Sequence, residues 1–352
     1  MRVPLMYGAW RPAAEERGAA AILTAILITV LIGFMAFVTD FGMAYANKRG
    51  LQNGADSAAL AVAQKIALQG SPTASCAQLA TVWDNPSSRA VAEDYFGRNR
   101  PGGDSAINHF DLVCVDDGKQ LVVEVGTAQN SPSFFGTLFG QDDVDIEQEA
   151  KAVVAPAKSV IGLRPFGVCK GVAEQIIAAP LINHTIRLDN VNFGCGDASG
   201  NWGIIDFNGG SNPTGEVIDW ILNGYNGPIS NSPPVYIPGQ PGAPSPGSLE
   251  AAMNSVLDDE IAIPVYDLLS GSGSTAQFRV MGFLSTKICG WKFQGRNGQG
   301  SCFDPLVVPA PVPQNYLQIR YNAFIPLADI ATNCTIGNFA CDLGTRSFKL
   351  AD

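Results

Sequence analysis

Residues 18–39 form one long apolar run that contains no charged side chain. A helix that crosses a bilayer needs ~20 such residues, whereas the apolar core of a signal peptide has only ~7–15. No prepilin-type glutamate follows Gly18, and a signal-peptidase site at 44–46 would follow an unusually long core. We therefore expect a retained transmembrane helix over residues 18–40, after a tail at 1–17.

The helical pattern continues beyond Asp40, because neither a proline nor a turn cluster occurs before Ser71-Pro72. Apolar positions recur there mostly at steps of three or four residues, at Tyr45, Leu51, Ala55, Ala59, Val62 and Ile66. This spacing predicts a stem helix over 41–69, and a helix from 18 to 69 would be ~78 Å long. Gly50 and Gly54 indicate either a kink near residue 50 or close packing against a partner.

Shorter elements follow at residues 70–158. Residues 87–97 predict a helix capped by Ser87 or Ser88, and Asp117-Gly118 between two alternating runs predicts a tight β-hairpin. An uncharged segment, SPSFFGTLFG, is expected to be an apolar turn, and DVDIEQEAKAVVA a strand. Together they indicate a small α+β unit that rests on the stem helix.

Residues 160–352 alternate short apolar runs with many turns, which is typical of a mostly β domain. The boundary is placed at 156–165, and the Gly-Ser-Gly-Ser run at 271–274 is expected to be a hairpin loop. Residues 230–247 are so rich in proline and glycine that we expect an excursion outside any core.

The composition fits a loop-rich domain outside the cell. Charged residues make up 15% of the 352 residues and the net charge is −10, which argues against nucleic-acid binding. Eight cysteines without a CxxC pair predict disulfides in an oxidising compartment. Eight cysteines allow ~105 pairings, of which the sequence-nearest is Cys76–Cys114, Cys169–Cys195, Cys289–Cys302 and Cys334–Cys341.

Charged residues on either side of the apolar run bear on the orientation of the helix in the membrane and on the role of Asp40. Arg2, Arg11 and Arg17 favour a cytoplasmic N-terminus, although Lys48 and Arg49 on the far side weaken the bias. The chain after about residue 40 is then extracytoplasmic. Asp40 is either a simple charge at the membrane edge or the partner of a basic residue on a neighbouring anchor.

No catalytic, cofactor or metal site is expected. His109 and His184 are the two histidines, and no GxSxG, HExxH or phosphate-loop motif accompanies them. The segment DASGN from Asp197 resembles a von Willebrand A metal motif but lacks the preceding buried strand. The acidic runs at 142–147 and 258–260 lack the spacing of a calcium loop and are expected to be solvated turns.

The polar residues around the apolar run carry a specific resemblance. Arg17-Gly18, the run itself, Asp40-x-Gly42, Tyr45 and LQNxADxAALA from Leu51 closely resemble the N-terminal region of TadE/TadG-like proteins. These proteins belong to the tight adherence (Flp) pilus system of bacteria. The resemblance covers residues 17–64 and favours the uncut TadG type.

The resemblance implies a non-enzymatic pilus-assembly component in the bacterial cytoplasmic membrane, with pilins, assembly proteins or a second copy as partners. The fold it implies is α+β: a transmembrane helix continued as a pilin-like stem, the small α+β unit and a disulfide-stabilised β domain. The expected interaction stem comprises Asp40, Gly42, Tyr45, Leu51, Gln52, Ala55, Asp56 and Ala59. An anchored module that binds an envelope glycan or protein is the alternative, and an envelope hydrolase ranks last.

Overall fold

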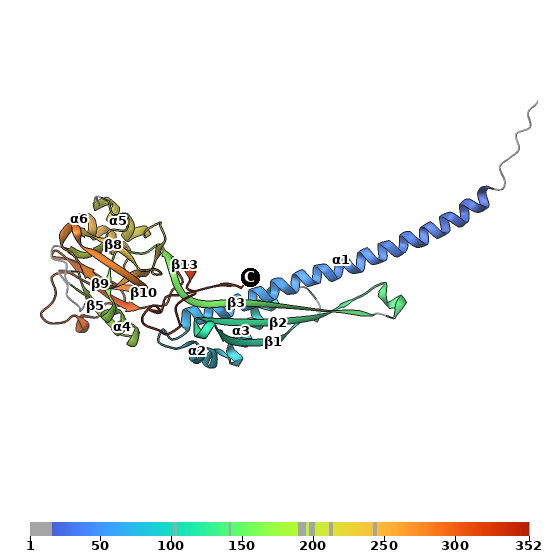
Figure 1. Cartoon of the computed structure of the whole chain (residues 1–352), viewed down its shortest axis with the longest axis horizontal. Coiled ribbons are helices and arrows are strands. Elements are labelled where there is room, and N and C mark those ends of the chain that lie inside the picture. Colours follow the sequence, from blue (N-terminus) through green and yellow to red (C-terminus); the bar gives the residue numbers. More distant parts are fainter. Residues whose placement is uncertain are drawn as a thin grey trace, which may run out of the picture.

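A computed structural model describes residues 16–100, 102, 104–140, 142–188, 195–196, 201–210, 214–241 and 245–351. Figure 1 shows a long N-terminal helix that projects from a stem sheet, with a β-rich head at the opposite end. The expected α+β class, with one long apolar helix followed mostly by β-sheet, is confirmed.

The first helix, α1 (Glu16–Gln69), runs without a break through Gly50 and Gly54. The helix is not interrupted near residue 50, where a kink was one of the two possibilities. Its N-terminal half exposes large apolar side chains, for example Phe37 at 69% and Leu23 at 67%. This helix is long and apolar enough to cross a membrane, with a mean hydropathy of 2.7 in its best window.

The C-terminal half of α1 is buried against the chain's own stem sheet. This antiparallel meander comprises β1 (Ala106–Val115), β2 (Gln120–Pro132) and β3 (Asp143–Ile161). Leu51 and Ile66 are fully buried in the resulting core, and each such side chain contributes ~1.5–3 kcal/mol. Alanines fill most of the remaining contact positions, so the helix axis lies close to the sheet.

Two helices and one tight turn complete the stem unit. The predicted hairpin is confirmed, since β1 and β2 are joined by a 3-10 turn at Asp116–Gly118, where both aspartates and the glycine adopt positive φ. The helices are α2 (Cys76–Trp83), which we did not anticipate, and α3 (Pro86–Asn99). The predicted N-cap of α3, Ser87 or Ser88, was wrong. The N-cap is Asn85, whose side-chain oxygen accepts a hydrogen bond from the Ser88 amide.

The head contains an eight-stranded sheet in which β9 (Glu260–Ser270), β10 (Gln277–Phe293) and β12 (Tyr316–Tyr321) are central. Gly271 and Gly273 have positive φ in the β9–β10 connection, so the predicted hairpin loop is confirmed. The remaining strands of this sheet are β4 (Val168–Cys169), β5 (Asn183–Arg187), β6 (Asn201–Ile205), β8 (Val235–Pro241) and β11 (Arg296–Gln299).

Two features of the head differ from the sequence expectation. Residues 230–247 include β8, which pairs with both β6 and β10 and buries Ile237. The excursion outside any core is therefore wrong for that segment. Three short helices also cover the sheet, α4 (Lys170–Ala178), α5 (Thr214–Asn223) and α6 (Pro246–Ser255).

The chain crosses between stem and head more than once. The boundary expected at 156–165 overlaps the end of β3, whose last residues pair with β7 (Ile229–Ser230) and β13 (Leu327–Ile330). The last strand, β14 (Arg346–Leu350), also pairs with β3 and packs Phe348 against the stem core. The C-terminal segment thus returns to the stem after building the head.

Four disulfides close this fold, in the sequence-nearest pairing. Cys76–Cys114 joins α2 to β1 in the stem, while Cys169–Cys195 and Cys289–Cys302 lie in the head. Cys334–Cys341 closes a short loop before β14.

Candidate membrane-proximal interaction site

Asp40 lies at the end of the exposed apolar half of α1 and binds the loop between β2 and β3. Its carboxylate accepts hydrogen bonds from the Ser133 hydroxyl at 2.7 Å and from the amides of Phe134, Phe135 and Gly136 at 3.0, 3.0 and 3.2 Å. Successive backbone N–H groups that converge on one anion form a nest. The negative charge is therefore compensated within the chain, without a basic side chain among these contacts.

Further polar contacts hold the β2–β3 hairpin, called the β2–β3 arm below, against α1. The Asn47 amide donates to the Ser131 hydroxyl at 2.8 Å, and Gln52 donates to the Glu149 carbonyl at 3.3 Å. Gln52 also donates to Asp56 one turn later, at 2.8 Å. The β2–β3 arm is thus held along α1 from residue 40 to residue 52.

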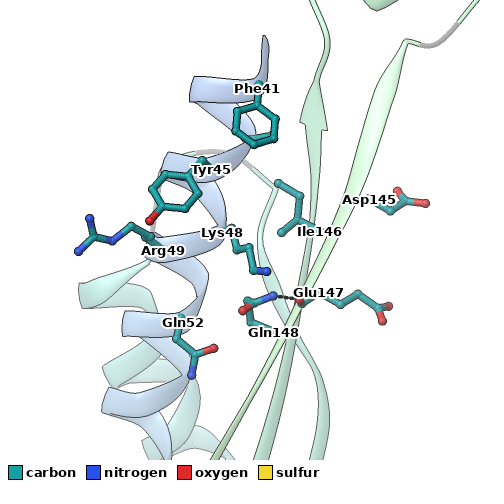
Figure 2. A pocket seen from close by; sticks show the side chains of 10 residues that line it. Phe41, Tyr45, Lys48, Arg49, Gln52, Asp145, Ile146, Glu147 and Gln148 are labelled. Atoms are coloured by element: carbon teal, nitrogen blue, oxygen red, sulfur yellow. Dashed lines mark hydrogen bonds between the residues drawn. The ribbon is translucent and has the colours of Figure 1, made fainter. Parts of the chain in front are cut away.

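A groove of about 600 Å³ lies between this part of α1 and the start of β3. Figure 2 shows Ile146 and Gln148 directed toward the helix, whereas Asp145 and Glu147 point away, as expected for alternate residues of a strand. Its lining is Phe41, Ala44, Tyr45, Lys48, Arg49, Gln52 and residues 145–148.

The helix side of the groove is aromatic and basic. Phe41 and Tyr45 are 64% and 56% exposed, and the Arg49 guanidinium lies over the Tyr45 ring at 6.0 Å. In Figure 2 Lys48 points toward β3 and Arg49 points away from it. This surface offers exposed rings and two positive charges to whatever lies beside α1.

The structure divides the residues of the expected interaction stem into two groups. Leu51, Ala55 and Ala59 are fully buried in the chain's own core. Gly42 and Tyr45 are exposed, and Asp40, Gln52 and Asp56 are half-buried in the contacts described above. Tyr45 lies six residues before Leu51, which is a rotation of about 240° around a helix of 3.6 residues per turn, so its side chain lies off the buried face.

The comparisons with known proteins concern this same helix. Residues 18–65 match the family model of putative Flp pilus-assembly TadE/G-like proteins. The resemblance recognised over 17–64 is thereby confirmed. No curated protein and no solved structure matches the chain. The matched TadE/G-like segment consists of the exposed apolar half of α1 together with most of its buried stem.

The other candidate residues do not assemble into a site. His109 lies 3.9 Å from Glu124 at the surface of β1, and His184 contacts the Ala179 carbonyl at 3.3 Å. Within the described ranges no three His, Cys, Asp or Glu side chains are placed to hold a metal ion. Residues 197–200, which include most of the DASGN segment, lie outside the described residues.

Within the acidic run at 258–260, Asp259 and Glu260 are exposed, whereas Asp258 makes structural contacts. Asp258 accepts from the Ser301 amide and hydroxyl, both at 2.7 Å, and lies 3.6 Å from the Lys287 ammonium. These contacts hold the head loop after β11 against the start of β9.

Sequence reasoning missed the partners of Asp40. Ser133 and the three amides that follow it were recognised only as part of an apolar turn. One usable signal was the absence of any charge from Ser131 to Gly140, next to a strand pair long enough to reach the membrane edge. The pairing itself joins segments 93 to 96 residues apart, and the local pattern of either segment does not show which distant segment lies beside it.

Proposed function

We propose that this chain is a membrane-anchored, non-enzymatic component of a Tad/Flp-type pilus assembly system in the bacterial cytoplasmic membrane. The observation that carries the proposal is the coincidence of the TadE/G-like match at 18–65 with α1. That helix exposes an apolar half and packs its other half on a folded domain, as an anchored assembly component requires.

The proposed orientation has the N-terminus in the cytoplasm and the remainder outside. All four disulfides follow Asp40 in the chain, and disulfides form and persist in oxidising compartments. The arginines before the apolar run favour the same orientation.

The surface proposed to meet pilins or assembly proteins is the exposed face of α1 at the groove. Because Leu51, Ala55 and Ala59 already pack within the chain, a partner has access to Gly42, Tyr45 and the groove instead. Exposed aromatic and arginine side chains are the residue types that contribute most to protein interfaces.

Deletion and complementation test the proposed function. We expect loss of surface pili and of adherence when the chain is deleted, and recovery with the wild-type chain. The variant Tyr45→Ala combined with Arg49→Ala should restore piliation poorly at an unchanged protein level. The control Leu306→Ala removes a side chain that is 90% exposed in the head and should complement fully. Normal piliation of the deletion strain would refute the proposal.

A further inference from the structure

We propose that the loop between β2 and β3, residues 133–140, enters the outer face of the same bilayer that α1 crosses, as a second membrane contact. The partner surface is lipid, at the boundary between headgroups and acyl chains. This inference rests on the membrane anchoring in the proposed function, and it adds a contact made by a different part of the chain.

The first support is the depth at which Asp40 holds the loop. A bilayer core is ~30 Å thick and a helix rises ~1.5 Å per residue, so about 20 residues fill the core. If residues 20–39 fill it, Asp40 lies at the edge of the hydrocarbon. The hydrogen bonds from Ser133 to Gly136 then place the loop at the same level.

The second support is the direction of the arm. Figure 1 shows the β2–β3 hairpin reaching along α1 toward the N-terminal end of the helix, away from the head. The short helix η2 (Gly136–Phe139) begins at Gly136, which supplies the last amide that binds Asp40. The tip of the hairpin is therefore directed toward the apolar half of α1.

The third support is the chemistry of the loop. Residues 133–140 read SFFGTLFG and contain no charged side chain. Phe134 is 63% exposed, although it belongs to a loop that is fixed by hydrogen bonds. An exposed aromatic side chain at the level of Asp40 would be covered by the interfacial region of the bilayer, where such residues are enriched.

The pairing also explains why a carboxylate is tolerated at this position. A charge near hydrocarbon is costly unless its hydrogen-bonding capacity is satisfied. The three amides of the nest and the Ser133 hydroxyl together supply four donors to Asp40, and the same bonds occupy amides that would otherwise enter the interface unpaired. Asp40 thus serves as a positioning residue for the loop.

Spin-label accessibility in the full chain tests this inference. All eight cysteines are paired, so a single new cysteine can be labelled with a nitroxide in nanodiscs of phosphatidylcholine and phosphatidylglycerol. Labels are placed by Phe134→Cys and, as a second loop position, Thr137→Cys. Phe37→Cys in the apolar half of α1 is the lipid reference, and Leu306→Cys in the head is the aqueous reference.

Collisions with oxygen and with a water-soluble nickel chelate report the surroundings of each label. We expect both loop labels to favour oxygen, as the Phe37→Cys label does, whereas the Leu306→Cys label favours nickel. In the Asp40→Ala background the loop labels should shift severalfold toward nickel, while the label at 37 is unchanged.

Three results would overturn the inference, and they are distinguishable. Loop labels that favour nickel as strongly as Leu306→Cys would show that the loop lies in water. Loop labels reached by neither reagent would show that protein covers the loop. A label at 37 that also favours nickel would refute the anchor itself, and with it the proposed function.

Discussion

Gly54 determines how closely α3 approaches α1. A Cβ atom at this position would lie 2.7 Å from the ring of Phe96, which is itself buried. Of the two sequence interpretations of the stem glycines, close packing is the one that applies to Gly54, but the neighbour is a helix of the same chain.

We expect Gly54→Ala to destabilise the chain although alanine is the better helix former. Alanine favours the helix by ~1 kcal/mol, whereas overpacking costs ~1–3 kcal/mol. The free energy of unfolding, measured by denaturant titration in detergent, should therefore fall by up to about 2 kcal/mol. The matched control is Gly42→Ala, which meets open space in the same helix and should not lower it. Equal effects at both positions would contradict the packing argument.

Asp258 makes part of the stability depend on pH. Hydrogen bonds from the backbone and side chain of Ser301, with the nearby Lys287, hold the pKa of Asp258 below its ordinary value of 3.8. The folded state therefore binds this proton less readily than the unfolded chain, and the stabilisation is present above about pH 4. It is lost as the pH falls through the lower folded pKa.

Asp258→Asn should therefore lower the free energy of unfolding at pH 7 and have a progressively smaller effect as the pH falls below about 4. Asparagine tolerates the positive φ of this position, so the backbone should be retained. The measurement is denaturant unfolding from pH 2 to 7, with Asp84→Asn at the exposed end of α2 as control. A difference from wild type that is the same at all pH values would contradict the assignment.

At the scale of elements, the C-terminal segment fastens the head to the stem. The Arg346 guanidinium pairs with Asp342 at 3.0 Å, and both side chains are buried. Arg346 also donates to the carbonyls of Ser71, Pro72 and Ala74 in the turn after α1, at 3.1, 3.3 and 3.4 Å. Arg346, paired with Asp342 in its own segment, thus joins β14 to the turn after the stem helix through these three carbonyls.

We expect Arg346→Met to lower the free energy of unfolding by ~3–5 kcal/mol, because it leaves Asp342 as a buried unpaired charge. Arg296→Met, which breaks a half-exposed pair with Glu250, should cost only ~0–1 kcal/mol. Adding Asp342→Asn to Arg346→Met should recover part of the loss. If the two arginine variants were equally stable in denaturant titration, the buried pair would not fasten these elements.

Strong local signals predicted their elements well. The uncharged run at 18–39 and the three- to four-residue steps after Leu51 predicted α1, and Asp117-Gly118 predicted the first hairpin. The short helices α4, α5 and α6 have only nine or ten residues each, so most of their stability comes from packing on the head sheet. We did not predict β8 because its sequence is rich in proline and glycine. It forms a strand nevertheless because it pairs with two neighbouring strands, β6 and β10.

Contacts between distant segments were beyond local patterning. The burial of Leu51, Ala55 and Ala59 was read from the sequence as a surface for a partner, since periodicity shows an apolar face but not what covers it. The nest on Asp40 joins positions 93 to 96 residues apart, and Arg346 reaches back more than 270 residues. Such pairings follow from the register of β3 with its neighbours.

At the scale of the whole molecule, the exchange of segments between stem and head should couple their unfolding. The strand β3 belongs to the stem sheet and also carries β7, β13 and β14. The loop closed by Cys334–Cys341 contacts the stem hairpin through the Ile336 amide, which donates to the Gly118 carbonyl at 3.0 Å. Unfolding of the stem therefore removes β3, the pairing partner of β13 and β14, which follow the head strands in the sequence.

Removing single disulfides tests this coupling. Cys76–Cys114 encloses 38 residues and Cys334–Cys341 only 7, so the chain-entropy contributions are about 4 and about 2 kcal/mol. Replacing both cysteines of a pair by serine should therefore be more costly for the first disulfide. In the Cys76→Ser, Cys114→Ser variant, with Trp10→Phe and Trp83→Phe added so that the remaining tryptophans belong to the head, the fluorescence should shift to lower denaturant together with the far-ultraviolet signal. If the head signal kept its wild-type midpoint while the helical signal shifted, stem and head would unfold independently.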